Sequence, residues 1–139
     1  MTTLPSGDNG SVLLRTDFSD ERAWKAALDD ATAPHPQPDG DAFQAFLVTF
    51  EDRAMAGWAP EVIAGLPTDG YAAYVFIADA RTMLDHTFVV VDLGEERGRW
   101  FRCSAGAVQV IENNLSTANM DFSELADGVG ADGVFRGFD

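Results

Sequence analysis

Apolar residues occur along this chain in two patterns, as short continuous runs and as stretches with helical spacing. The continuous runs predict five strands, because buried strands are short and apolar along their length. They lie in SVLLRTDF (11–18), in 45–50, and in YAAYVFIADA (71–80), HTFVVVDLG (86–94) and RWFRCSA (99–105). The runs at 71–80 and 86–94 are nearly free of polar residues, so we expect them at the centre of a sheet, covered on both faces.

Helical spacing of apolar residues appears in four stretches: 24–31, 60–66, 108–115 and 122–129. Ser19 is the expected N-cap of the first helix, and Pro60 suits the first turn of the second. Asp121, followed by Glu124 three residues later, gives the last helix a capping-box pattern. The proline-rich segment APHPQPDGD (33–41) is expected to be an exposed loop.

The order of these elements, β-α-β-α-β-β-β-α-α, predicts an α/β fold. Its βαβαβ beginning implies right-handed crossovers and parallel strands, and the short connections that follow imply antiparallel additions. We therefore expect a single mixed, mostly parallel five-stranded sheet flanked by helices. The length of 139 residues fits one domain, which we place at 11–139, after a flexible N-terminal segment at 1–10. The final GVFRGFD is expected to dock its two phenylalanines on the core.

Charge and composition narrow the choice of partner and compartment. The net charge is -14, from 23 acidic against nine basic residues, which disfavours nucleic acid and favours a basic protein partner. Hydrophobic residues make up 46% of the chain, enough for a core that needs no disulfide, and Cys103 is the single cysteine. With no signal-like N-terminus and no apolar run of about 20 residues, we expect a cytoplasmic protein with no membrane contact.

Several catalytic signatures are absent from the sequence. It contains no phosphate-binding loop, no dinucleotide-binding fingerprint, no zinc-binding pair and no nucleophile elbow. Of its two histidines, His35 lies in the proline-rich loop and His86 begins the fourth strand. A catalytic couple of Cys103 and His86 is one hypothesis, but a lone cysteine on a strand is more often a small buried apolar residue.

Aspartates end several of the predicted strands. If the first three strands are parallel, Asp17, Asp52 and Asp79 share one end of the sheet, where their carboxylates could bind Mg²⁺. Asp92 lies at the opposite end if the fourth strand is antiparallel. A divalent-metal-assisted hydrolase or phosphoryl-transfer enzyme is therefore one alternative function. We favour the simpler interpretation, in which aspartates make turns and cap helices.

A cluster of short polar side chains marks VIENNLSTANMDFSEL, residues 110–125. Capping explains Asp121, Glu124 and one asparagine, since Asn tolerates the left-handed conformation that ends a helix. Glu112 and Asn113 fall opposite the apolar face of their helix, so they either face solvent or contact a partner. The arginines of RGRWFR (97–102) either pair with the neighbouring Glu95 and Glu96 or belong to an interface with Trp100.

The leading hypothesis is a small acidic binding protein, in its concrete form an immunity or inhibitor protein for a basic toxin or enzyme. We expect its partner to contact surface acids and amides with two aromatic anchors: Glu112, Asn113, Asn114, Asp85, Glu95, Glu96, Trp58 and Trp100. A second alternative is a small-ligand-binding or biosynthetic accessory protein with a pocket lined by Trp24, Trp58 or Trp100.

Five segments carry a resemblance to a known family: LLRTDFSDERAW, FIADA, VVVDL, IENNLSTANMDFSELADGV and DGVFRGF. Together they resemble an uncharacterised family of small bacterial single-domain proteins with a domain of unknown function. The similarity covers nearly the whole chain, and IENNLSTANMDF is its most specific part. The resemblance implies one domain and brings with it no activity, cofactor or catalytic residue.

Overall fold

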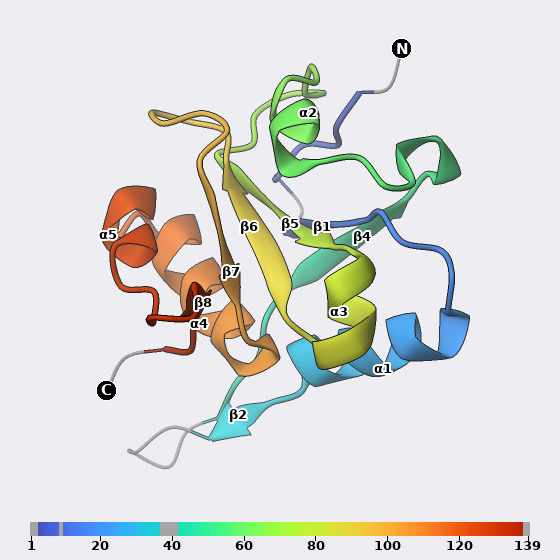
Figure 1. Ribbon diagram of the computed structural model, residues 1–139. Coiled ribbons are helices and arrows are strands. Elements are labelled where there is room, and N and C mark those ends of the chain that lie inside the picture. Colours follow the sequence, from blue (N-terminus) through green and yellow to red (C-terminus); the bar gives the residue numbers. More distant parts are fainter. Residues whose placement is uncertain (1–2, 9, 37–41, 138–139) are drawn as a thin grey trace.

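A mixed six-stranded sheet forms the centre of the computed structural model, which describes residues 3–8, 10–36 and 42–137 (Figure 1). The strands are β1 (Ser11–Arg15), β4 (Leu47–Glu51), β5 (Tyr74–Ala78), β6 (Phe88–Asp92), β7 (Trp100–Cys103) and β8 (Val134–Phe135). Their order is β4-β1-β5-β6-β7-β8. Since β6 is antiparallel to both of its neighbours and the other pairs are parallel, five strands run the same way. The predicted mixed, mostly parallel α/β sheet is therefore confirmed.

Helices cover both faces of the sheet. They are α1 (Glu21–Thr32), the 3₁₀ helix η1 (Arg53–Met55), α2 (Pro60–Ala64), α3 (Ala80–Asp85), α4 (Ala105–Ser116) and α5 (Phe122–Ala126). One face buries Leu13, Phe76 and Val90 against α1, α4 and α5. The other face buries Leu14, Val75 and Val89 against α2 and η1. In Figure 1, α2 accordingly lies across the sheet from α1. No helix within the described ranges is long and apolar enough to cross a membrane.

Two elements correct the sequence prediction. The run 71–80 was expected to be one strand, but β5 ends at Ala78 because Asp79 caps a new helix, α3, by accepting the Thr82 N–H at 3.1 Å. The predicted five strands become six because β8 pairs with β7. At two residues, β8 is too short to show a strand pattern in the sequence.

Smaller differences concern the first half of the chain. The N-cap of α1 is Asp20, whose side chain accepts the Ala23 N–H at 3.0 Å, and not Ser19. Within the N-terminal segment 1–10, Leu4 is 1% exposed and forms a bridge with Thr68. The loop 33–41 contains part of a small two-stranded sheet, β2 (His35–Pro36) with β3 (Ala42–Phe43).

The C-terminal segment docks partly as expected. Phe135 is 1% exposed and belongs to the core between the sheet and α5. Phe138, the other phenylalanine of that segment, lies outside the described residues.

The direction of the strands divides the sheet into two ends that carry different chemistry. We call the end that follows β1, β4, β5 and β7 the carboxyl end, and the end that precedes them the amino end. Asp17, Asp52 and Asp79 lie at the carboxyl end, as predicted for parallel strands, and Asp92 lies at the amino end because β6 runs in the opposite direction.

Candidate functional site

The three aspartates at the carboxyl end are each held by local hydrogen bonds. Asp17 accepts the N–H of Ser19 at 3.0 Å and its hydroxyl at 2.5 Å. Asp52 caps η1 by accepting the Ala54 N–H at 2.9 Å. In the described ranges, no three Asp, Glu, His or Cys side chains are placed to hold a metal ion. The structure therefore gives these aspartates capping and turn roles and does not bring them together as ligands.

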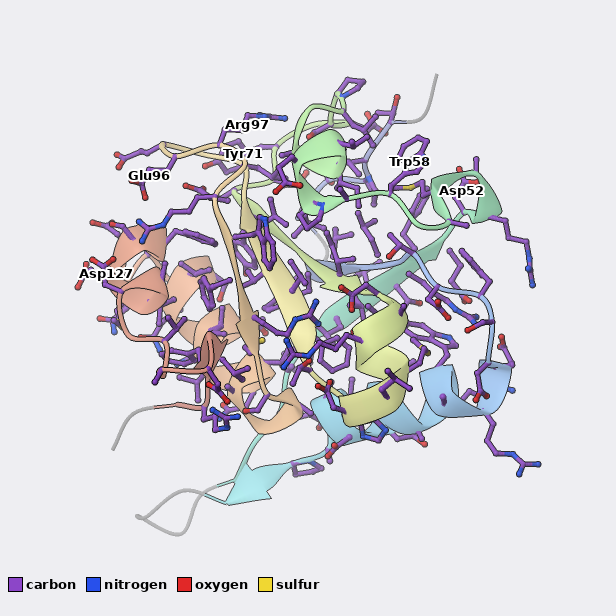
Figure 2. All side chains as sticks on the ribbon, in the orientation of Figure 1. Asp52, Trp58, Tyr71, Glu96, Arg97 and Asp127 are labelled. Carbon is purple, nitrogen blue, oxygen red and sulfur yellow. The ribbon has the colours of Figure 1, made fainter. Side chains whose placement is uncertain are left out.

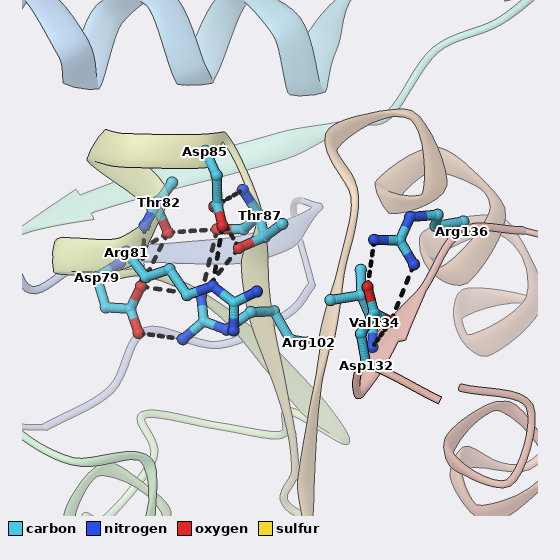
Figure 3. Close-up of polar contacts among 9 residues, drawn as sticks. All are labelled: Asp79, Arg81, Thr82, Asp85, Thr87, Arg102, Asp132, Val134 and Arg136. Atoms are coloured by element: carbon cyan, nitrogen blue, oxygen red, sulfur yellow. Dashed lines mark hydrogen bonds and ion pairs between the residues drawn. The ribbon is translucent and has the colours of Figure 1, made fainter. Parts of the chain in front are cut away.

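Asp79 forms the centre of a polar network with Arg102, shown in Figure 3. The Arg102 guanidinium donates to both carboxylate oxygens, at 2.6 and 3.1 Å. Thr82 donates its hydroxyl to the Thr87 carbonyl at 2.6 Å, which ties α3 to the beginning of β6. Burial by itself would raise the pKa of Asp79, but the hydrogen bonds and charge of Arg102, together with the hydrogen bonds from Thr82, outweigh it and hold that pKa below its ordinary value. The network joins β5, α3, β6 and β7.

Asp85, predicted as a partner-binding acid, belongs to the same end of the sheet. Its carboxylate accepts the N–H and hydroxyl of Thr87, at 2.9 and 2.6 Å, and the Arg81 guanidinium at 2.9 Å. The side chain therefore serves the turn between α3 and β6.

A crevice of about 520 Å³ opens beside this network, between the carboxyl ends of β1 and β5. Asp17, Trp58 and Asp79 are among its lining residues. The chain leaves β1 toward β4 and leaves β5 toward β6, in opposite directions along the sheet, and open α/β sheets commonly bind ligands at such a place. Of the three tryptophans named for the small-ligand alternative, Trp58 lines this crevice, Trp24 is buried in the core, and Trp100 donates to Glu61 at 2.8 Å.

A buried arginine at the end of β1 was missed by the sequence analysis. The Arg15 side chain is 2% exposed and pairs with Glu21 at 2.7 Å and Glu51 at 2.8 Å. Its guanidinium also lies over the rings of Phe18 and Trp24, at 4.7 and 5.1 Å from their centroids. The sequence did contain a signal, since Arg15 ends the otherwise apolar run SVLLR. A charged residue in a buried strand needs partners, so acidic residues nearby could have been expected.

The amino end of the sheet carries a longer depression, which we call the acidic groove. It consists of two adjoining hollows of about 270 and 470 Å³ that share five lining residues: Tyr71, Ala73, Tyr74, Leu115 and Ala118. Six acidic residues line it as well: Asp8, Asp92, Glu95, Glu96, Glu112 and Asp121. Within the described ranges, neither lysine nor arginine contributes to this lining. The acidic groove is therefore a site of concentrated negative charge.

The carboxylates of the acidic groove differ in how they are bonded. Asp92 is 5% exposed and accepts the N–H groups of Gly94 and Glu96, at 2.7 and 2.8 Å, so it shapes the turn after β6. Glu96 also pairs with Arg99 at 2.7 Å. Asp8 and Glu95 have no side-chain partner among the residues that the structure describes. These two carboxylates are available to a cationic ligand.

Glu112 joins the asparagine-rich stretch 110–125 to the acidic groove. Its carboxylate accepts the Phe46 N–H at 3.1 Å, next to a 2.6 Å hydrogen bond between the hydroxyls of Ser11 and Tyr74. Burial raises the pKa of Tyr74, and the negative charge of Glu112 raises it further. Glu112 therefore faces the groove and contacts the chain before β4.

The asparagines of this stretch mainly end α4. Asn114 donates to the Val110 carbonyl at 2.8 Å and accepts from the Asn119 amide at 2.8 Å. The backbone turns at Ala118, which has a positive φ of 55°. Asn113 is exposed on the outer side of α4. The capping-box pattern at α5 is confirmed, since the Asp121 N–H donates to Glu124 at 3.2 Å.

The structure does not gather all the predicted partner residues on one surface. Glu95, Glu96 and Glu112 line the acidic groove, with Asn113 and Asn114 next to it on α4 and Trp100 at the start of β7. Asp85 and Trp58 lie at the carboxyl end. Figure 2 shows this separation, with Tyr71 and Glu96 on one side of the molecule and Trp58 on the other.

Two aromatic residues of the acidic groove were missed by the sequence analysis. Phe46 is 75% exposed and Tyr71 is 74% exposed, and both line the groove. Tyr71 follows the turn TDG directly, and an aromatic residue beside a turn was the signal that could have identified it.

The cysteine–histidine hypothesis finds no support in the geometry. Cys103 is fully buried in β7, and burial raises the pKa of its thiol to about 12. His86 has a positive φ of 59° at the end of α3 and lies 3.1 Å from Asp30. A thiol with such a pKa is protonated near neutral pH, and only the thiolate is a good nucleophile. Cys103 is therefore a buried core residue and not a catalytic one.

Comparisons with known proteins give a family and no activity. Searches of curated proteins and of solved structures find no match to this chain. A family model described as a domain of unknown function, DUF6924, matches residues 10–138. That match confirms the resemblance to an uncharacterised family over nearly the whole chain, and the chain belongs to the DUF6924 family.

Proposed function

We propose that this protein binds a basic protein partner in the acidic groove. The observation that supports the proposal is the lining itself, where acidic side chains and exposed aromatic rings occur together without a described lysine or arginine. A cationic segment would find both charge and apolar contact there. An inhibitor or immunity protein that shields the cationic active site of a toxin or enzyme is the concrete form of this function.

Electrostatics supports fast and selective encounter. A net charge of -14 creates a field that attracts a cationic partner and repels anionic ones. Asp8 and Glu95 add to this field at the groove, where their carboxylates have no described cation beside them. Such interactions weaken as salt rises, because the screening length falls to about 8 Å at physiological ionic strength.

The aromatic rings supply the part of the affinity that salt does not remove. Phe46 and Tyr71 expose most of their surface, and buried aromatic side chains dominate the energy of many protein interfaces. Arginine or lysine of the partner can also stack on these rings, which contributes about 0.5–2 kcal/mol per contact. A partner that presents basic and apolar side chains together therefore fits the acidic groove best.

The test is affinity capture from the native cell lysate with matched variants. Glu95→Gln combined with Glu112→Gln removes two groove charges, and the amide oxygen introduced at position 112 can still accept the Phe46 N–H. Asp29→Asn combined with Asp30→Asn removes two charges from α1, outside the groove. We expect the wild type and the α1 variant to retain one stoichiometric basic protein that salt releases, and the groove variant to lose it. Equal retention by both variants, or no retained protein at low salt, would overturn the proposal.

A further inference from the structure

The outer side of β4 is an open edge of the sheet. β4 is the last strand in the order and pairs only with β1 among the described elements. Its sequence, LVTFE, contains no lysine and no proline, the residues that commonly protect sheet edges. Val48 is 37% exposed, and Phe46, just before the strand, is 75% exposed. An unprotected apolar edge of this kind is suited to pairing with another extended chain.

The register shows which backbone groups are available. Ser11 lies opposite Leu47, and its N–H donates to the Phe46 carbonyl at 3.0 Å. A residue in a parallel ladder bonds the two residues that flank the one opposite, so Val48, like Phe46, points its backbone groups toward β1. Successive residues of a strand alternate in direction. The N–H and C=O groups of Leu47, Thr49 and Glu51 therefore point outward, and no described residue bonds them.

This edge is continuous with the acidic groove. Phe46 lines the groove and begins the edge, and its N–H is bonded by Glu112. At the other end of β4, Glu51 exposes 44% of its side chain beside Asp52. The apolar middle of the edge therefore has carboxylates at both ends, those of the acidic groove at one end and, at the other, Glu51, which also pairs with Arg15 at 2.8 Å. A strand with apolar residues in its middle and basic residues at its ends is complementary to this arrangement.

We infer that the basic partner binds by adding an extended segment to β4, with its backbone bonded to Leu47, Thr49 and Glu51. The inference rests on the proposed function, because the acidic groove supplies the attraction for the basic end of that segment. A second copy of this chain is a poorer occupant, since each copy carries a net charge of -14 and would bring like charges together at both ends. Main-chain hydrogen bonds would supply the affinity, and the flanking carboxylates would supply the specificity for a basic partner.

The probe for this inference is the synthetic peptide KKVTVTVKK, titrated by calorimetry at low salt. A second peptide of the same sequence carries methyl groups on alternate backbone nitrogens, which removes strand-forming donors and keeps every charge. We expect the methylated peptide to bind at least about tenfold more weakly, because tenfold corresponds to only 1.4 kcal/mol and several hydrogen bonds are lost.

Variants of the protein test the same edge. Thr49→Pro removes an outward N–H and leaves the bonds to β1, and proline is tolerated at such edge positions. Val48→Lys adds a charge at the edge, and Val62→Lys is its matched control because Val62 is 53% exposed on α2. We expect Thr49→Pro and Val48→Lys to weaken peptide binding about tenfold and Val62→Lys to leave it unchanged. A thermal melt of each variant confirms folding.

The outcomes separate the two proposals. If both peptides bind equally and only Glu95→Gln with Glu112→Gln weakens them, the acidic groove stands and strand addition is overturned. If neither peptide binds at low salt, strand addition is overturned while capture from the lysate still decides the groove. If the wild type forms a dimer in solution that Thr49→Pro dissociates, the edge belongs to a second copy and the partner strand is overturned as its occupant.

Discussion

The carboxyl end of the sheet and the acidic groove at its amino end both carry acidic residues, but only the groove has carboxylates without a described partner. At the carboxyl end, each strand-end aspartate is hydrogen-bonded within the chain, and Asp79 also forms an ion pair with Arg102 at 2.6 Å. In the acidic groove, Asp8 and Glu95 have no described side-chain partner, and Tyr71 is 74% exposed. Charges that are paired within the chain stabilise its fold, whereas charges left without a partner are available for binding. Acidic residues therefore have two different duties in this protein.

The largest expected effect is on stability at the carboxyl end. Asp79→Ala removes the cap of α3 and leaves the Arg102 guanidinium, whose side chain is 10% exposed, without its carboxylate. We expect a loss of about 3 kcal/mol in the free energy of unfolding, since uncapping costs about 1 kcal/mol and an unpaired buried charge about 2 or more. Urea denaturation measures it.

Two controls sharpen this prediction. Asp52→Ala removes a strand-end aspartate that caps only the short η1, so we expect a loss of about 1 kcal/mol or less. Adding Arg102→Met to Asp79→Ala is expected to recover part of the loss, because no unpaired charge is then left in the network. Equal losses for Asp79→Ala and Asp52→Ala would contradict the special role of the Arg102 pair.

The pH dependence of stability is the next effect in size. The pKa of Asp79 in the folded protein lies below its ordinary value of 3.8, so its carboxylate stabilises the folded state at all higher pH. That stabilisation is lost as the pH falls below 3.8 toward the folded pKa. We expect acid unfolding of Asp79→Asn to be less steep there than that of the wild type. Parallel curves for the two proteins would show that Asp79 does not contribute.

Groove substitutions are expected to leave stability nearly unchanged. Glu95→Gln removes a charge that pairs with no described residue, so the free energy of unfolding should change by less than about 0.5 kcal/mol. Binding of the peptide KKVTVTVKK should still fall, by about threefold, and less so as salt rises. Urea denaturation measures the first effect, and calorimetry at two salt concentrations measures the second. A large loss of stability would place Glu95 with the structural acids of the carboxyl end.

The smallest expected effect is that of magnesium. Asp17, Asp52 and Asp79 accept hydrogen bonds from their own neighbourhood, and no group of three metal-binding side chains occurs in the described ranges. We therefore expect Tm to stay constant up to about 10 mM Mg²⁺, since only a bound ion raises it. A rise that Asp79→Asn abolishes would restore the metal-assisted alternative and contradict the division between the two ends.

Local patterns predicted much of the fold because they depend on neighbours in sequence. The apolar runs indicated β1, β5 and β6, and the spacing of Asp121 and Glu124 marked the beginning of α5. The same local rules failed where a helix follows a strand directly, with no loop between them. The run 71–80 hides a strand end at Ala78, because Asp79 and Ala80 fit the end of a strand and the beginning of a helix equally well.

The sequence by itself determined the fold class, the acidic character and the family of this protein. Tertiary structure alone decided which acids are free, because pairing depends on residues far apart in the chain. Arg102 reaches Asp79 across β6, and Glu112 reaches the Phe46 N–H from α4. The acidic groove arises in the same way, where Asp8, Tyr71 and Leu115 converge at the amino end of the sheet. Only the paths of the strands bring those residues together, so the spacing of residues along the sequence does not predict that they are neighbours.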